Sequence, residues 1–212
     1  LQKSATIVHG NALRVDWHSL IQPLPFEKSS GRYDFILGNP PFLGKQYQNQ
    51  EQKKDMTEVF YGVNASGALD YVAAWYIKAA QYILMSNRLQ NSAGYGANVS
   101  STTNRTICAF VSTNSISQGE QVSILWGELF NKYKVKIHFA HRTFKWSNEA
   151  KGNAAVHVVI IGFSDFDISE KRIFEYDDIK GEPHEVKAKN INPYLVEGKD
   201  EYVVRRKQPI CN

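Results

Sequence analysis

The chain has 212 residues, of which 42% are apolar and 22% charged, an ordinary globular balance with room for one large or two small domains. No apolar run reaches the roughly 18 residues that a membrane span needs, and the first ten residues do not resemble a signal peptide, so we expect a cytoplasmic protein. The two cysteines, Cys108 and Cys211, argue against a disulfide framework or a structural zinc site, and a net charge of +4 does not by itself indicate a nucleic-acid partner.

Short apolar segments alternate with helical patterns along the chain, which favours an α/β fold built on one sheet. The expected strands span residues 5–9, 33–38, 107–112, 135–140 and 154–163. Apolar residues at helical spacing predict helices over residues 67–85 and 119–131. The last two strands are expected to pair as an antiparallel hairpin at an edge of the sheet.

Two further segments have no clear helical period. Residues 86–105 are rich in Ser, Asn, Gly and Thr, and we interpret them as a long loop. From residue 165 onward, charged and β-prone residues alternate, with Gly181, Pro183 and Pro193 as breakers. This change of composition predicts a domain boundary near residue 165.

The most specific feature is Asn39-Pro40-Pro41-Phe42, which directly follows the expected strand of residues 33–38. Ligands in open α/β sheets bind beyond the carboxyl ends of the strands, so this turn is well placed for a site. The alternative is a proline-rich turn with a structural role only, since Asn-Pro commonly starts turns.

These residue types suit the methylation of an exocyclic amino group, whose lone pair is delocalised into an aromatic ring. The Asn39 side-chain oxygen and the Pro40 carbonyl oxygen can accept both N–H hydrogens, which frees the lone pair to attack a methyl sulfonium. Pro40 and Pro41 fix these acceptors before a substrate arrives. Phe42 offers a ring face to a flipped base, and such stacking is worth about 1–3 kcal/mol.

The same turn resembles the (Asn/Asp/Ser)-Pro-Pro-(Phe/Tyr/Trp) signature of DNA amino-methyltransferases, whose Asn and Phe versions are typical of adenine N6 enzymes. Stretches 10–17, 70–76, 110–116 and 144–150 resemble the MmeI-like enzymes, which join restriction and modification in one polypeptide. This resemblance implies a Rossmann-like class I methyltransferase sheet, S-adenosyl-L-methionine as the cofactor and double-stranded DNA as the partner. A membrane partner is not expected.

The resemblance also implies roles for individual residues. Asn11 and Asp70 would contact the cofactor, although Asn11 could be a plain turn residue and Asp70 could stabilise a helix N-terminus. Phe144 or Trp146 would pack against the extruded base, with the two not distinguished and a place in the core as the alternative. A basic cluster beside them would contact phosphates, with a solvated strand face as the alternative: Lys132, Lys134, Lys136, Arg142, Lys145 and Lys151.

One departure from the family pattern concerns the cofactor loop. The glycine-rich loop and the acidic residue that binds the ribose are both absent from the sequence. By resemblance, residues 1–165 would be the C-terminal part of the catalytic domain, holding only the later strands of the sheet. Residues 166–212 would be a linker and the start of a target-recognition region, and the rest of the same polypeptide would supply the cofactor loop. We therefore expect residues 5–9 to be displaced, paired with another copy or weakly held, and the chain alone to be inactive.

The hypothesis is methyl transfer from S-adenosyl-L-methionine to adenine N6 in a flipped DNA base, within a restriction-modification system. An RNA or protein-glutamine amino-methyltransferase is one alternative, because such enzymes use similar Asn-Pro-Pro-(Phe/Tyr) turns. A non-catalytic DNA-recognition fragment is another. His138 and His141 are three residues apart in an expected strand and would point to opposite faces, so no metal site is predicted.

Overall fold

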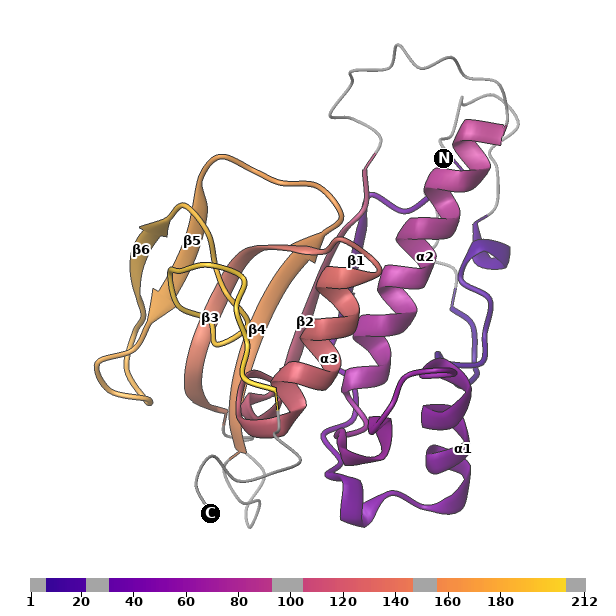
Figure 1. The fold of residues 1–212 in the computed structure, drawn as a ribbon, viewed down its shortest axis with the longest axis horizontal. Coiled ribbons are helices and arrows are strands. Elements are labelled where there is room, and N and C mark those ends of the chain that lie inside the picture. Colours follow the sequence, from indigo (N-terminus) through magenta and orange to yellow (C-terminus); the bar gives the residue numbers. More distant parts are fainter. Residues whose placement is uncertain (1–6, 22–30, 93–104, 147–155, 205–212) are drawn as a thin grey trace, which may run out of the picture.

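The protein folds around a six-stranded sheet with the strand order β1-β2-β4-β3-β5-β6. This is a computed structural model, and it describes residues 7–21, 31–92, 105–146 and 156–204. The strands are β1 (Phe35–Gly38), β2 (Ile107–Thr113), β3 (Lys136–Trp146), β4 (Val156–Ser164), β5 (Lys171–Glu175) and β6 (His184–Ala188). The helices are α1 (Gln50–Val59), α2 (Ala73–Ser92) and α3 (Gly119–Asn131), and α2 and α3 lie along one face of the sheet (Figure 1).

The direction of the strands decides which loops meet. β1 runs parallel to β2, and β3 runs parallel to β5. β4 lies between β2 and β3 and is antiparallel to both. The carboxyl ends of β1, β2, β3 and β5 therefore reach the same side of the sheet. We call this side, marked by Gly38, Thr113, Trp146 and Glu175, the carboxyl edge.

The predicted hairpin is antiparallel as expected, but its expected place in the sheet is wrong. β3 and β4 lie in the middle of the sheet, because β5 pairs with the far side of β3 and β6 extends the sheet further. β5 and β6 were not predicted as strands, and both lie beyond residue 165 in the same sheet. The assignment of residues 166–212 to a linker and a target-recognition region stays a prediction.

The helix predictions succeed where the apolar spacing is regular. α3 has the predicted bounds, whereas α2 begins at Ala73, six residues later than predicted. The delay has a backbone cause, because residues Ser66–Ala68 form a separate 3₁₀ turn that ends in an extended conformation at Leu69. α2 then continues to Ser92, into the predicted loop, and residues 93–104 lie outside the described ranges.

Two other differences concern short elements. α1 was missed because its exposed positions are strongly polar, although Asn49 and Gln52 form a capping box that marks its start. The strand predicted at residues 5–9 is not seen in its described part, residues 7–9, and Ile7 is 91% exposed. Residues 147–155, which include the predicted turn of the hairpin, are not described.

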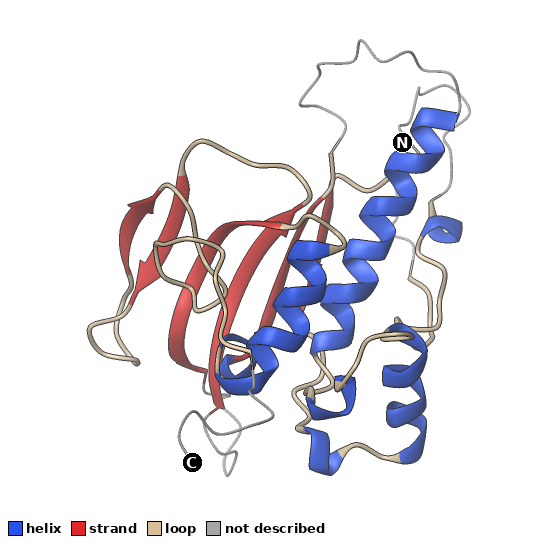
Figure 2. Ribbon diagram, viewed as in Figure 1, coloured by secondary structure: helices blue, strands red, loops and turns tan. Residues whose placement is uncertain are grey.

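The core forms where α2 and α3 pack against the sheet (Figure 2). Tyr76 of α2 is its centre, with its ring stacked on Phe163 at 5.2 Å and edge-on to Phe110 at 5.3 Å. Trp126 of α3 packs against the same tyrosine, and the buried Tyr76 hydroxyl lies 2.8 Å from Ser112 Oγ. This packing fixes the helices on β2 and β4. Among the described helices, none is both long and apolar enough to cross a membrane.

Candidate functional site

The turn of residues 39–42 lies at the carboxyl edge, immediately after β1. Asn39 and Pro41 are exposed, Pro40 is buried and Phe42 is half-buried. Within the described ranges, neither the Asn39 amide nor the Pro40 carbonyl has a hydrogen-bond partner. Both groups are therefore free to accept hydrogen bonds from a bound molecule. We refer to this segment as the 39–42 turn.

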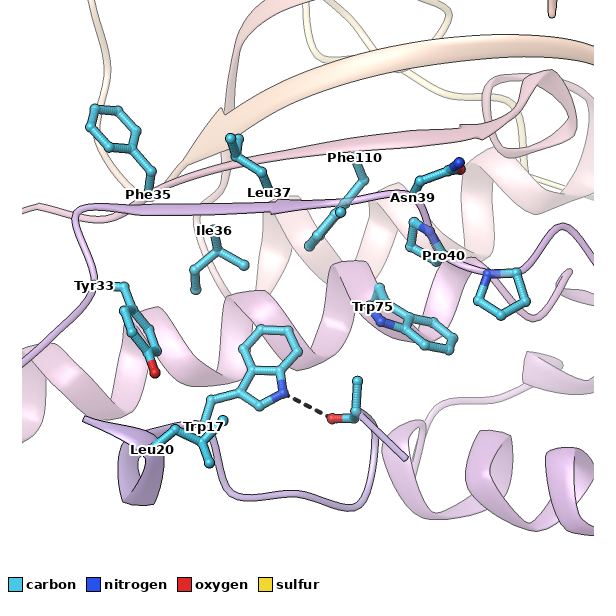
Figure 3. A pocket seen from close by; sticks show the side chains of 13 residues that line it. Trp17, Leu20, Tyr33, Phe35, Ile36, Leu37, Asn39, Pro40, Trp75 and Phe110 are labelled. Atoms are coloured by element: carbon cyan, nitrogen blue, oxygen red, sulfur yellow. Dashed lines mark hydrogen bonds between the residues drawn. The ribbon is translucent and has the colours of Figure 1, made fainter. Parts of the chain in front are cut away.

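A cavity of about 410 Å³ runs along β1 and reaches the 39–42 turn. Its walls come from residues 12–20, from Tyr33 and β1, from the 39–42 turn, and from α2 and β2. The lining residues are Ala12, Trp17, Leu20, Tyr33, Phe35, Ile36, Leu37, Gly38, Asn39, Pro40, Pro41, Trp75 and Phe110. Figure 3 shows Asn39 on the opposite side of β1 from Ile36, with Trp17 facing the strand from across the cavity. The volume falls in the usual range for small-molecule sites, about 300–1,000 Å³.

The cavity is lined by five aromatic residues that the sequence did not mark as site residues: Trp17, Tyr33, Phe35, Trp75 and Phe110. Trp17 is held in place because its indole N–H donates to the Ala12 carbonyl at 2.8 Å. Trp17 and Trp75 belong to stretches that resemble the family, which was the available signal. Their convergence on β1 is a tertiary contact, and no periodicity could have predicted it.

Asn11 lies beside the cavity without lining it, whereas its neighbour Ala12 does line it. The Asn11 amide nitrogen donates to Asp55 Oδ2 at 2.8 Å, and the Asn11 side-chain oxygen accepts from the Leu13 N–H at 2.9 Å. Both ends of the amide thus have partners in the protein, and they order the turn of residues 11–15. The cofactor role of Asn11 stays a prediction.

Asp55 of α1 is buried, with 2% of its surface exposed, and it joins three segments. Besides Asn11, it accepts hydrogen bonds from Arg14 Nε at 2.7 Å and from the Tyr71 hydroxyl at 2.6 Å. Burial alone would raise the pKa of Asp55, but these hydrogen bonds outweigh it and hold the pKa below its usual value. Burial and the same carboxylate raise the pKa of Tyr71 to about 12. We call Asn11, Arg14, Asp55 and Tyr71 the Asp55 junction.

Asp70 does not line the cavity. Its Oδ2 accepts from Ser115 Oγ at 2.5 Å, and its Oδ1 accepts from the Lys45 N–H at 3.3 Å. Its own N–H donates to Gln121 Oε1 at 3.0 Å. We call Lys45, Asp70, Ser115 and Gln121 the Asp70 junction. The prediction that Asp70 contacts the cofactor is likewise untested.

Phe144 and Trp146 end β3 and therefore reach the carboxyl edge. Phe144 is stacked on Tyr176 with the ring centroids 5.0 Å apart, and Trp146 lies 6.1 Å from Phe144. Trp146 is 37% exposed, whereas Phe144 is half-buried in this aromatic group. β2 and β4 separate both residues from the 39–42 turn, so the structure brings the pair to the same edge without contact.

The predicted basic cluster is not gathered into one patch. Lys136 and Lys145 lie near opposite ends of β3, about 30 Å apart at the usual strand rise. Carboxylates pair with three of the cations, in the ion pairs Lys132–Glu128, Lys136–Asp200 and Arg142–Glu175. In the described chain, Lys134 and Lys145 have no carboxylate within ion-pair distance, and Lys151 lies outside the described residues.

The two histidines of β3 serve packing. His138 is buried with Nε2 at 2.8 Å from the Phe166 carbonyl oxygen, and the His141 ring is stacked on Phe174 at 4.2 Å. Across the ranges that the structure describes, no three His, Cys, Asp or Glu side chains gather as a metal site would require.

Comparison with known proteins gives one consistent result. A family model described as "MmeI, DNA-methyltransferase domain" matches residues 1–175. The chain is 41% identical over 212 residues to DNA methyltransferase A of Bacillus subtilis (strain 168), and it spans 21% of that relative's length. It superposes with a TM-score of 0.80 on the Type IIL restriction-modification enzyme MmeI, solved in complex with DNA. That match has 48% identity and covers 97% of this chain and 24% of MmeI.

Proposed function

The chain belongs to the family of MmeI DNA-methyltransferase domains, and on this premise we propose that, within its intact polypeptide, it methylates the N6 amino group of adenine in DNA, with S-adenosyl-L-methionine as the methyl donor. The observation that carries the proposal is the 39–42 turn, whose two acceptors have no partner in the described chain and whose residues Asn39, Pro40 and Pro41 line the 410 Å³ cavity. Both relatives are DNA-modifying enzymes by name, and a DNA substrate is proposed on that basis.

The proposed mechanism relies on the two acceptors of the 39–42 turn. The Asn39 side-chain oxygen and the Pro40 carbonyl accept the two N6 hydrogens, and the nitrogen lone pair then points away from the ring plane. The methyl group would come from the sulfonium of the bound donor, so that formation of the N–C bond would accompany cleavage of the C–S bond and leave a neutral thioether. The nitrogen then carries a positive charge, and its extra proton passes to water. A strong general base is therefore not required.

The cavity fits the methyl donor in size and lining. Its aromatic residues Trp17, Tyr33 and Trp75 offer flat surfaces suited to an adenosyl group, and Asn39, Pro40 and Pro41 of the 39–42 turn line it as well. When bound, S-adenosyl-L-methionine supplies a methyl group on a positively charged sulfur. Asn11 orders the turn that presents Ala12 to the cavity. In this proposal the chain excludes water from the donor and places Asn39 and Pro40 next to it.

The target adenine lies inside a duplex, so the proposal includes flipping of the base out of the stack. Phe42 and the pair Phe144 and Trp146 are the aromatic rings proposed to receive it. Phosphate contacts are proposed for the basic residues, with Lys134 and Lys145 as those free of an ion pair within the described chain. An enzyme that modifies cellular DNA in a restriction-modification system would act in the cytoplasm.

The experiment is Asn39→Ala in the intact polypeptide. We expect turnover on duplex DNA to fall by about 100- to 1,000-fold, equivalent to about 2.7–4 kcal/mol in the barrier, because one preorganised acceptor is lost. Transfer of a labelled methyl group measures turnover, and nucleoside analysis identifies N6-methyladenine. Isothermal titration should show little change in affinity for S-adenosyl-L-methionine.

Asn64→Ala is the matched control, because Asn64 is an exposed asparagine after α1 that does not line the cavity. It should turn over like wild type. Wild-type turnover by Asn39→Ala would contradict the proposal. Methylation of RNA or of a glutamine peptide in preference to DNA would favour the alternative substrates, and a wild-type protein that binds DNA without methyl transfer would favour a recognition role.

A further inference from the structure

We propose that Asp70 and Ser115 are positioning residues that hold the 39–42 turn in its reactive geometry. This inference rests on the proposed function, and it assigns Asp70 a different task from the cofactor contact expected by resemblance. The two side chains lie 45 residues apart in sequence, and Ser115 Oγ donates to Asp70 Oδ2 at 2.5 Å. Neither residue lines the cavity.

The segment that follows the 39–42 turn is fastened to residues 69–71 at three points. The Leu43 carbonyl accepts from the Tyr71 N–H at 2.9 Å, and the Lys45 N–H donates to Asp70 Oδ1 at 3.3 Å. The buried Gln48 side chain donates to the Leu69 carbonyl at 3.0 Å. The segment on the C-terminal side of the 39–42 turn is therefore fixed.

The near side of the turn is fixed as well. Gly38 is paired with Phe110 in the parallel ladder between β1 and β2. Between Gly38 and Leu43 lie only the four residues of the turn, and two of them are prolines with restricted φ. The position of the Asn39 and Pro40 oxygens is thus decided by the two ends of a short, stiff segment.

Asp70 links this segment to the loops at the neighbouring strand. Ser115 belongs to the 3₁₀ turn Asn114–Ser117 that follows β2, and Gln121 lies in the first turn of α3. Ser115 Oγ is also 2.9 Å from Thr113 Oγ1, the last residue of β2. The Lys45 ammonium adds a link to Glu120 of α3 at 3.4 Å. Through Asp70, the 39–42 turn is therefore braced against the carboxyl end of β2.

A direct cofactor contact is the competing role, and the geometry favours positioning. Both carboxylate oxygens of Asp70 already accept hydrogen bonds from the chain. Positioning predicts that loss of Asp70 lowers kcat and leaves the affinity for the methyl donor unchanged. A cofactor contact predicts instead that loss of Asp70 mainly weakens the affinity for the methyl donor.

The experiment compares Asp70→Ala, Ser115→Ala, Ser115→Thr and Asp70→Asn in the intact polypeptide. We expect kcat to fall about 100-fold for Asp70→Ala, since a displacement of about 1 Å has that order of effect. Ser115→Ala should lose about 10-fold, the lower end for a supporting residue. Ser115→Thr keeps the hydroxyl, and the Asp70→Asn amide can accept from Lys45 and donate to Ser115. Both should therefore recover kcat to within about threefold of wild type.

The matched control is Ser117→Ala, in the same 3₁₀ turn. The Ser117 hydroxyl donates only to the nearby Asn114 carbonyl, at 2.8 Å, and does not touch Asp70. It should keep wild-type kcat. If Ser115→Ala and Ser117→Ala are equal in kcat, the positioning role is wrong, even where Asp70→Ala fails to fold. A dissociation constant for S-adenosyl-L-methionine that rises by the factor by which kcat falls would instead assign Asp70 to the cofactor.

Failure of this inference is distinguishable from failure of the proposed function. Full activity of Asp70→Ala and Ser115→Ala beside an inactive Asn39→Ala overturns the positioning role alone. Full activity of Asn39→Ala overturns the proposed function itself.

Discussion

The Asp55 junction and the Asp70 junction are each built around an aspartate, and the two aspartates differ in burial and in hydrogen-bond partners. Asp55 is 2% exposed and accepts from three side chains, those of Asn11, Arg14 and Tyr71. Asp70 is half-buried and accepts from one side chain and one backbone N–H. The two junctions meet at the start of α2, because Asp70 and Tyr71 are adjacent in the chain.

The difference in burial predicts that one aspartate contributes mainly to stability and the other mainly to turnover. Asp55 and Tyr71 are both buried, so removal of the carboxylate leaves the Tyr71 hydroxyl without a partner, whereas water can reach Arg14. At the Asp70 junction water can replace much of what is lost, and the remaining cost is one of geometry at the 39–42 turn. Asp55 should therefore matter mainly for the free energy of unfolding, and Asp70 mainly for turnover.

The largest effect on stability is expected for Asp55→Ala. We expect the free energy of unfolding to fall by about 3 kcal/mol, near the low end for breaking a buried charged pair, because Arg14 can be partly rehydrated. Urea denaturation of the purified chain measures this. Glu51→Ala is the control, since Glu51 binds the same arginine at 2.7 Å but its side chain is 73% exposed. It should cost less than about 1 kcal/mol, and equal losses for the two variants would contradict the comparison.

The contribution of Asp55 should also depend on pH. Its pKa is lowered in the folded state, so the folded protein binds fewer protons there than the unfolded chain does. The stabilisation is full above the unfolded pKa of about 3.9, and it is lost as the pH falls through the lower folded-state pKa. Urea titrations of wild type and Asp55→Ala at pH 7 and pH 3 should give a smaller difference at pH 3. A difference that does not change with pH would show that the carboxylate charge is not what stabilises the junction.

The smallest effect on stability is expected for Asp70→Ala. Its partners lie at the carboxyl edge, where water can hydrogen-bond them, so we expect a loss of about 1 kcal/mol or less. The same urea titration checks this beside the Asp55 variants. A loss as large as that of Asp55→Ala would mean that Asp70 supports the whole fold, and its effect on turnover could then not be assigned to the 39–42 turn alone.

Local sequence patterns predicted several elements because the forces that form them act between near neighbours. The apolar spacing of α3 gave its bounds, and the capping pair Asn49 and Gln52 would have revealed α1. The run before Asn39 predicted β1 and placed the 39–42 turn after it. These features need only the periodicity of one element and the restricted backbone of proline.

These local patterns could not predict which distant segments of the chain pair with one another. The alternation of charged and β-prone residues in β5 and β6 did not show that these strands extend the sheet past β3. The residue pattern within one strand does not indicate which other strand it pairs with. For the same reason the cluster from Lys132 to Lys151 was interpreted as one basic segment. In the structure Lys136, Arg142 and Lys145 are spread along β3, and Asp200 and Glu175 pair with the first two.

The sequence by itself was enough to locate the 39–42 turn, to place it after a strand and to identify the family to which the chain belongs, whereas the chemistry of the turn stays a proposal. Only the tertiary structure decided what surrounds that turn, because the partners of Asp55 and Asp70 are 16 to 51 residues away in sequence. Such contacts form when the helices and strands pack, and their hydrogen bonds depend on burial and distance rather than on local spacing. The aromatic wall of the cavity, with Trp17, Tyr33 and Trp75 from three segments, has the same origin.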